Sequence, residues 1–491
     1  MVAARPMSLN PYVGATDPAV RDVGHLLYRS LLRLDQDAFP RPDLASSYTV
    51  SPDGLTYHVV LGVAHRWSDG QLITVNDVLA TVDFAQSPAT GDQAMSAQLQ
   101  GVKVTPSAGA IAFTLPAPRA SFAATLSQLP ILPLGSLSAA RSAALVTRPS
   151  AAMATSGAYE VQSADGNNVV LARNPYASQR AAMGSVQLRL FSAFADAAAA
   201  FSAGQVDGVL AITPAQRAQL LSVKGSVAHD IATFRFVDLL FNQRTPGLDD
   251  QLVRHALGAA VSRTGIVSGA LQGAGGLVQV SPISDGLRWA APASNLELAE
   301  PTVSAQALEG DGWTIGPAGV RERRGVVLAY TLSVPDADPL PTVAHELAQQ
   351  LAAVGVTIDV NVVPAMDFVV KTLVPHAFQM ALADWDSGPD PDISAFWRSN
   401  AKPPKGFNVS GGKTDPFLDQ SLDSLATLSD PAARLAAAQS VIQHLAEDAP
   451  AIFLYTPEVS YVVRGGMKHM PIPMLGGSAA RFDSVAQWQR S

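Results

Sequence analysis

The chain has 491 residues, which exceeds the size of one compact core and predicts two or three domains. Hydrophobic residues make up 48% and charged residues 15%, so the chain has ample apolar material to bury and is not disordered as a whole. The net charge of −8, with no Lys/Arg run between aromatic residues, excludes a nucleic-acid-binding protein, which needs a basic surface.

Cysteine is absent, which excludes a disulfide framework, a thiolate metal site and a cysteine nucleophile. No run of about 18 apolar residues occurs, so no transmembrane helix is predicted. The start of the chain, residues 1–6, lacks the basic and apolar regions of a signal peptide. We interpret it as the start of a trimmed, exported protein.

Residues 48–115 are predicted to be rich in strands. Apolar and polar residues alternate over 57–61, and two alternating runs on either side of the turn 106–109 predict a hairpin. Between them, Thr74 is a predicted helix N-cap, with Asp77 three residues later in the capping-box position.

The pattern changes after this region. Residues 186–190 alternate as a strand, residues 194–203 are helical up to Gly204, and residues 206–210 form a second short strand. A strand–helix–strand order predicts that the two strands pair in parallel.

The last part of the chain repeats this order on a larger scale. Strands are predicted over 325–334 and 356–362 around a helix over 341–353, and a short strand over 379–383 follows. Asp430-Pro431 begins a long amphipathic helix, because proline at the first helical position loses no hydrogen bond. The predicted fold class is therefore α/β, with two lobes around a strand-rich insertion.

Three sequences resemble catalytic or metal-binding motifs but are incomplete. His345 has Gln349, not histidine, one turn later, so a helical zinc pair is missing. Residues 384–392 alternate carboxylates like a calcium loop, but Gly388 and Ala395 replace required ligands. The glycines of 273–276 follow a helix-like stretch and not a strand. The sequence thus predicts no enzyme, no cofactor and no metal site.

Several blocks together resemble the peptide/nickel-binding family of ABC-transporter substrate-binding proteins, especially its dipeptide- and oligopeptide-binding members. The similarity runs through nearly the whole chain, and its motifs are Ser8-Leu9-Asn10-Pro11-Tyr12, Leu27-Tyr28-Arg29-Ser30-Leu31, Pro42-Asp43-Leu44-Ala45, Ser51-Pro52-Asp53-Gly54, Trp67-Ser68-Asp69-Gly70, Thr155-Ser156-Gly157-Ala158-Tyr159, Val253-Arg254-His255-Ala256-Leu257, Trp385 to Pro391, Asn408-Val409-Ser410 and Asp415-Pro416-Phe417.

The resemblance implies a two-lobed periplasmic-binding-protein-like fold with a hinged cleft between the lobes. Lobe I is expected to comprise 1–40, 155–245 and 465–491, the inserted strand-rich domain II 41–154, and lobe III 246–464. It further implies an extracytoplasmic monomer that delivers its solute to the permease of an ABC importer. Membrane attachment is expected only through a lipid anchor upstream of the present start.

The resemblance also implies a binding site along the segment that contains Trp385. Main-chain groups of this segment are expected to pair with a peptide like an added strand, while an aspartate receives the terminal ammonium. Gly388 stands where the family has that aspartate, so Asp386, and next Asp384, are the expected replacements. The alternative for Asp386 is a carboxylate that caps the loop. The predicted site residues here are Ala383, Asp384, Trp385, Asp386, Ser387 and Gly388.

Five further residues are candidates for ligand contact, and three of them, Asn242, Tyr455 and Arg398, have a structural alternative. Asn242 and Tyr455 match ligand-lining positions, with a buried turn amide and core packing as the alternatives. Thr16 and Asp17 lie in an early loop expected to reach the cleft, and Asp17 is a second candidate for the ammonium. Arg398 is a candidate for a ligand carboxylate or a surface arginine.

Other functions remain open at this point. Members of the family also bind haem, nickel complexes, glutathione or glycans, and a non-transporting member acting as an envelope regulator is a different class. The sequence shows no histidine cluster for a metal.

Overall fold

The computed structural model describes residues 1–2, 8–87, 91–107, 110–135, 153–283, 287, 289, 299–403, 406–409 and 414–490. The chain folds into two compact units, Met1–Ile231 with Val459–Ser491, and Ala232–Glu458. The expected bounds of lobe I and lobe III stay predictions. The predicted separation of domain II, 41–154, from lobe I stays a prediction.

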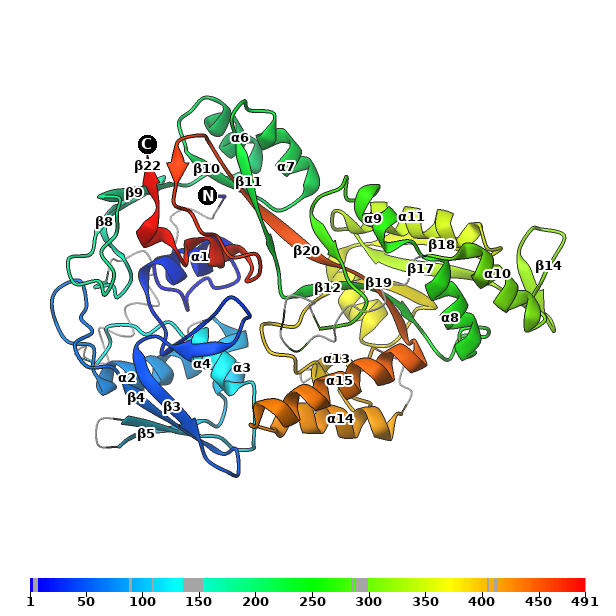
Figure 1. The fold of residues 1–491 in the computed structure, drawn as a ribbon, viewed down its shortest axis with the longest axis horizontal. Coiled ribbons are helices and arrows are strands. Elements are labelled where there is room, and N and C mark those ends of the chain that lie inside the picture. The colour runs from blue at the N-terminus through cyan, green and yellow to red at the C-terminus, as the bar shows by residue number, and fades with distance from the viewer. Residues whose placement is uncertain are drawn as a thin grey trace. The chain divides into compact units, whose positions relative to one another are not determined.

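The first unit contains several small antiparallel sheets (Figure 1). Its strands are β1 (Leu32–Leu34) and β2 (Pro40–Pro42), then β3 (Ala45–Val50), β4 (Thr56–Leu61), β5 (Lys103–Ser107) and β6 (Ala110–Thr114), then β7 (Tyr159–Ala164), β8 (Asn168–Arg173) and β9 (Ser185–Arg189), and β10 (Gly208–Ala211), β11 (Val227–Ala232), β21 (Met467–Lys468) and β22 (Gln489–Arg490). Its helices are α1 (Pro18–Leu27), α2 (Val75–Gln86), α3 (Gln93–Leu99), α4 (Phe122–Ser127), α6 (Phe194–Ser202) and α7 (Pro214–Leu221), with short 3₁₀ turns η3 (Ser478–Phe482) and η4 (Val485–Gln487).

The strand-rich prediction for this unit is confirmed. The order β3-β4-β6-β5 forms a four-stranded sheet, and Val104 lies opposite Phe113 in the predicted hairpin. The tip of that turn, residues 108–109, lies outside the described residues. α2 begins directly after Thr74, whose main-chain N–H donates to the Asp77 carboxylate at 2.8 Å.

The predicted parallel pairing within 185–210 is wrong. β9 pairs with β8, whereas β10 pairs antiparallel with residues 460–463 at the end of β20 (Ala451–Val463). Alternation along a strand shows which residues share a face, but it does not identify the neighbouring strand. Here the neighbour of β10 comes from the opposite end of the chain.

The second unit contains a mixed sheet in the order β20-β12-β19-β17-β18. β12 (Arg235–Phe241) is antiparallel to β20 and to β19 (Met380–Asp386), whereas β17 (Ala329–Pro335) is parallel to β19 and to β18 (Thr357–Val363). β13 (Gly276–Val278) adds to β20, and β14 (Thr314–Ile315), β15 (Arg321–Arg323) and β16 (Val326–Val327) form a separate small sheet.

Helices of this unit pack against the sheet and against one another (Figure 1). They are α8 (Gln251–Ala260), α9 (Arg263–Ser268), α10 (Pro301–Gly310), α11 (Leu340–Ala352), α12 (Ala365–Asp367) continuing into the π-helix η2 (Phe368–Leu373), α13 (Ser394–Trp397), α14 (Pro416–Thr427) and α15 (Pro431–Asp448). α11 buries Val343, Leu347 and Leu351 in the core, as its period predicts.

Three helices begin at the same dipeptide, Asp-Pro. Asp17, Asp415 and Asp430 are the N-caps of α1, α14 and α15, and each carboxylate accepts main-chain N–H groups of the first turn. Proline follows each cap, where its fixed φ suits the helix and its missing N–H costs nothing. The sequence therefore fixes these helix starts locally. Within the described ranges, no helix is long and apolar enough to cross a membrane.

Candidate functional site

Along β19, the main-chain N–H and C=O groups of every second residue face β12. Asn242 donates its main-chain N–H to the carbonyl of Gln379, and Ser387 donates its N–H to Phe234. Odd-numbered residues between 379 and 387 therefore point their N–H and C=O groups at β12. By strand alternation, Asp384 and Asp386 point theirs to the opposite edge.

This opposite edge is paired with β17 only at its beginning. The register between the two strands ends at Ser333 opposite Ala381, although β19 continues to Asp386. β17 ends with Pro335, which has no N–H to donate to the sheet. Within the described part of the chain, the main-chain groups of Asp384 and Asp386 on this edge have no strand partner. The structure thus presents a short unpaired edge that can accept an extended backbone.

Charged side chains lie on one face of this edge. Arg235 is opposite Asp386 in the register. Its guanidinium donates two hydrogen bonds to the carboxylate of Asp384, with Nε–Oδ1 at 3.0 Å and Nη2–Oδ2 at 2.6 Å. Asp386 is exposed, and its Oδ1 accepts the N–H of Gly388 at 3.0 Å. Because Arg235 compensates Asp384, one negative charge, that of Asp386, remains without an ionic partner among the described residues.

Burial raises the pKa of Asp384 to about 6, against the opposing effect of Arg235 and with a smaller raising effect of Asp386. The side chain is 17% exposed. Since its folded pKa lies above the unfolded value of 3.8, the contribution of Asp384 to the free energy of unfolding is greatest below about pH 4 and declines until about pH 6.

This shift gives a measurable expectation. The carboxyl carbon of Asp384 should titrate near pH 6 in NMR spectra, and Arg235→Met should move its pKa higher, because the lowering contribution of the guanidinium is lost. Asp384→Asn should remove the decline in stability between pH 4 and 6 that chemical denaturation detects. A wild-type titration near pH 4 would contradict the burial of this carboxyl.

Tyr455 lies next to this charged pair. It is opposite Val237 in the register and is 1% exposed, and its hydroxyl has no hydrogen-bond partner among the described residues. Burial raises its pKa far above the usual range, with Asp384 adding to the shift and Arg235 opposing it. The hydroxyl is therefore a protonated donor at every physiological pH.

Trp385 lies on the opposite face of β19. Its indole Nε1 donates to Oδ1 of Asp238 at 3.0 Å, and its ring packs on Phe396 and Phe407 with centroids at 5.0 and 5.9 Å. Asp238 is fully buried, and burial raises its pKa well above the usual range, against the indole hydrogen bond. Trp385 thus anchors β19 through one face of the strand, while Asp384 and Asp386 lie on the other face.

The other predicted residues are placed elsewhere. Asn242 gives both side-chain N–H groups to the carbonyls of His376 and Phe378, and Arg398 binds Asp423 and Asn400. Thr16 is exposed, and Asp17 caps α1 through Ala19; both belong to the first unit. The structure therefore brings together Ala383 to Gly388 and Tyr455, and ligand contact by all of the predicted residues stays a prediction.

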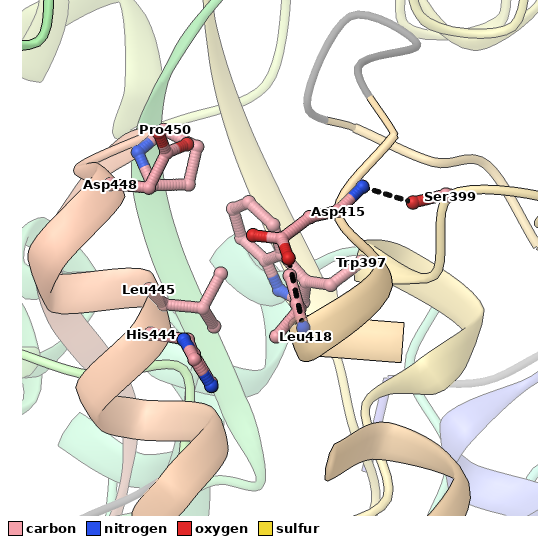
Figure 2. Close-up of a pocket in the computed structure, with 8 residues that line it drawn as sticks. All are labelled: Trp397, Ser399, Asp415, Leu418, His444, Leu445, Asp448 and Pro450. Atoms are coloured by element: carbon pink, nitrogen blue, oxygen red, sulfur yellow. Dashed lines mark hydrogen bonds between the residues drawn. The ribbon is translucent and has the colours of Figure 1, made fainter. Parts of the chain in front are cut away.

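A small pocket lies among α13, α14 and the end of α15 (Figure 2). It is lined by Trp397, Ser399, Asp415, Leu418, His444, Leu445, Asp448 and Pro450, and its free space is about that of one water molecule. Figure 2 shows His444 and Leu445 on one helix, facing Trp397 and Leu418. The pocket is too small for a peptide.

Three carboxylates of the incomplete calcium motif are bound by other side chains of the protein, and Asp386 is the exception. Asp384 binds Arg235, Asp390 binds Arg434, and Asp392 accepts from Ser394. No group of three histidine or acidic side chains able to hold a metal occurs within the described ranges.

Comparison with known proteins identifies the family of the chain. Residues 40–407 match the family described as bacterial extracellular solute-binding proteins, family 5 Middle. A putative ABC transporter peptide-binding protein of Brucella ovis is 27% identical over 422 residues, covering 81% of this chain and 75% of that protein.

Two solved structures share the fold. NikZ from Campylobacter jejuni in complex with Ni(L-His) has a TM-score of 0.73 at 22% identity, covering 100% of this chain and 98% of that one. The oligopeptide-binding protein AppA from Bacillus subtilis in complex with a nonapeptide has a TM-score of 0.66 at 20% identity, covering 100% and 97%. The predicted α/β binding-protein fold is confirmed.

Proposed function

This chain belongs to family 5 of the bacterial extracellular solute-binding proteins, and we propose that it captures a peptide for uptake by an ABC importer. The observation that carries the proposal is the unpaired edge of β19 beside Asp386. An extended peptide pairs with such an edge through main-chain hydrogen bonds, and its ammonium pairs with a carboxylate. The similarity to the Brucella peptide-binding protein and to peptide-bound AppA supports a peptide ligand.

Main-chain pairing has a consequence for selectivity. Hydrogen bonds to peptide N–H and C=O groups do not distinguish side chains, so the site should accept peptides of varied sequence. We also propose that the protein is a monomer that a lipid anchor holds at the outer face of the cytoplasmic membrane. There it delivers its ligand to the importer's permease.

A thermal-shift assay with a mixed peptide library tests the function. A ligand that binds only the folded state at about 100 times its dissociation constant adds about 2.7 kcal/mol to the free energy of unfolding, so Tm should rise with peptide. The same assay with a metal chelator should give the same shift. No shift with any peptide would overturn the peptide proposal.

A nickel–histidine complex is the second candidate, because the chain shares its fold with NikZ bound to Ni(L-His). In that case nickel with histidine should raise Tm and a chelator should abolish the shift. The two candidates are thus separated by one pair of measurements.

A further inference from the structure

The segment that leaves β19 has few restraints of its own. Ser387 donates its N–H and its hydroxyl to the carbonyl of Phe234, at 3.0 and 2.9 Å, and the chain then turns at Gly388, whose φ is +68°. No other described atom lies within 4 Å of a Cβ built on Gly388. Because glycine restrains the backbone little, the position of the segment beyond it must be fixed from elsewhere.

The nearest side-chain restraint downstream is Asp390. Its carboxylate accepts from Arg434 on α15, with Nη1–Oδ2 at 2.8 Å and Nη2–Oδ1 at 2.5 Å, and Oδ1 also accepts the N–H of Asp392 at 3.0 Å. The side chains of Arg434 and Asp390 are only 7% and 13% exposed. A buried bidentate pair fixes distance and orientation together.

Arg434 is itself fixed on two further sides. Its Nε donates to the carbonyl of Leu425 at 3.0 Å, and its guanidinium lies over the ring of Trp289 at 5.3 Å. Lysine has a single rotatable ammonium in place of the planar fork and does not reproduce this arrangement.

Pro389 and Pro391 flank Asp390, so the backbone around it has few accessible conformations. With Asp390 held, the short segment from Ser387 to Asp390 is anchored at both ends, which limits how far Gly388 lets the end of β19 move. From this geometry we propose that Arg434 is a positioning residue, which holds the unpaired edge at Asp384 and Asp386 in place through Asp390. The inference rests on the proposed function at one point, the assumption that this edge binds the peptide.

Hydrogen exchange tests the positioning without any ligand. Arg434→Met should speed exchange of the hydrogen-bonded amides of Trp385 and Ser387 by about tenfold or more, because local opening of the strand end becomes easier. Arg254→Met is the matched control, since Arg254 is a buried arginine of the same unit, 1% exposed and paired with Asp448. It should leave exchange of the Trp385 and Ser387 amides unchanged. Asp390→Asn is the milder second variant if Arg434→Met does not fold, and Arg434→Lys should recover only part of the protection.

Binding is the second readout, measured with tetra-alanine and with tetra-alanine N-methylated at its second residue. Arg434→Met should weaken the binding of tetra-alanine by about tenfold. It should also reduce the loss of affinity that N-methylation causes, because main-chain pairing is lost. A purely structural role would leave that penalty unchanged. Equal exchange of the Trp385 and Ser387 amides in the Arg434 and Arg254 variants would overturn the positioning role. If the wild type binds no peptide while exchange responds as expected, the proposed function fails and the positioning role stands.

Discussion

Replacing Asp386 with asparagine is expected to weaken binding of a free-amine peptide by about 100-fold, which corresponds to about 2.7 kcal/mol. The peptide ammonium loses water when its backbone pairs with β19, and a desolvated charge without a partner is strongly unfavourable. The N-acetylated form of the same peptide carries no ammonium, so the substitution should change its affinity little. Isothermal titration calorimetry of both peptides against both proteins measures the difference.

The geometry favours Asp386 over Asp384 for this role. Arg235 already compensates Asp384 through two hydrogen bonds, whereas the partner of Asp386 among the described residues is the N–H of Gly388. Asparagine keeps a side-chain oxygen for that N–H, so Asp386→Asn removes the charge and retains the turn.

Asp17→Asn is the control. Asp17 caps α1, and asparagine is an equally good N-cap, so this variant changes a charge without disturbing its helix. If Asp17→Asn weakens the free-amine peptide by about 100-fold and Asp386→Asn does not, the ammonium is bound at Asp17. If neither matters and acetylation is harmless, the site does not recognise a free N-terminus, and longer or non-peptide ligands become the better explanation.

The sequence predicted the elements of the fold more accurately than their partners. The helix start at Asp430 and the parallel pair β17–β18 follow from a local cap and from alternation. The end of β19 was placed at Ala383, but the strand continues to Asp386. Aspartate is a poor strand former, so the residue propensities predict a strand that is too short. Pairing with β12 extends the strand to Asp386.

At the site, too, the sequence predicted the local segment but not its partners from distant parts of the chain. The segment around Trp385 was found through its motif, but Arg235 and Asp238 were missed. Asp238 carried a usable signal, because a lone carboxylate in the apolar run Phe236 to Phe241 must be buried in the strand. The pairing of Arg235 with Asp384 had none, since it joins residues 149 positions apart in sequence.

Trp385→Phe is expected to lower the free energy of unfolding by about 1–3 kcal/mol more than Trp397→Phe does. Both tryptophans are buried, and both substitutions remove an indole N–H and shrink the ring. The N–H of Trp385 is bonded to Asp238, whereas Nε1 of Trp397 has no partner among the described residues. The difference between the two variants therefore isolates one hydrogen bond to a buried carboxyl.

The size of the effect follows from what remains behind. The indole N–H is the side-chain donor to Oδ1 of the fully buried Asp238, and Oδ2 already lacks a partner among the described residues, so the substitution leaves the carboxyl without a side-chain donor. Leaving such a group unsatisfied is more costly than losing a hydrogen bond that water can replace. Asp238→Leu in the Trp385→Phe background should then recover stability, because an apolar side chain of similar size needs no donor. Urea denaturation of the four proteins measures these differences, and equal losses for the two Trp→Phe variants would show that the Trp385–Asp238 bond contributes nothing.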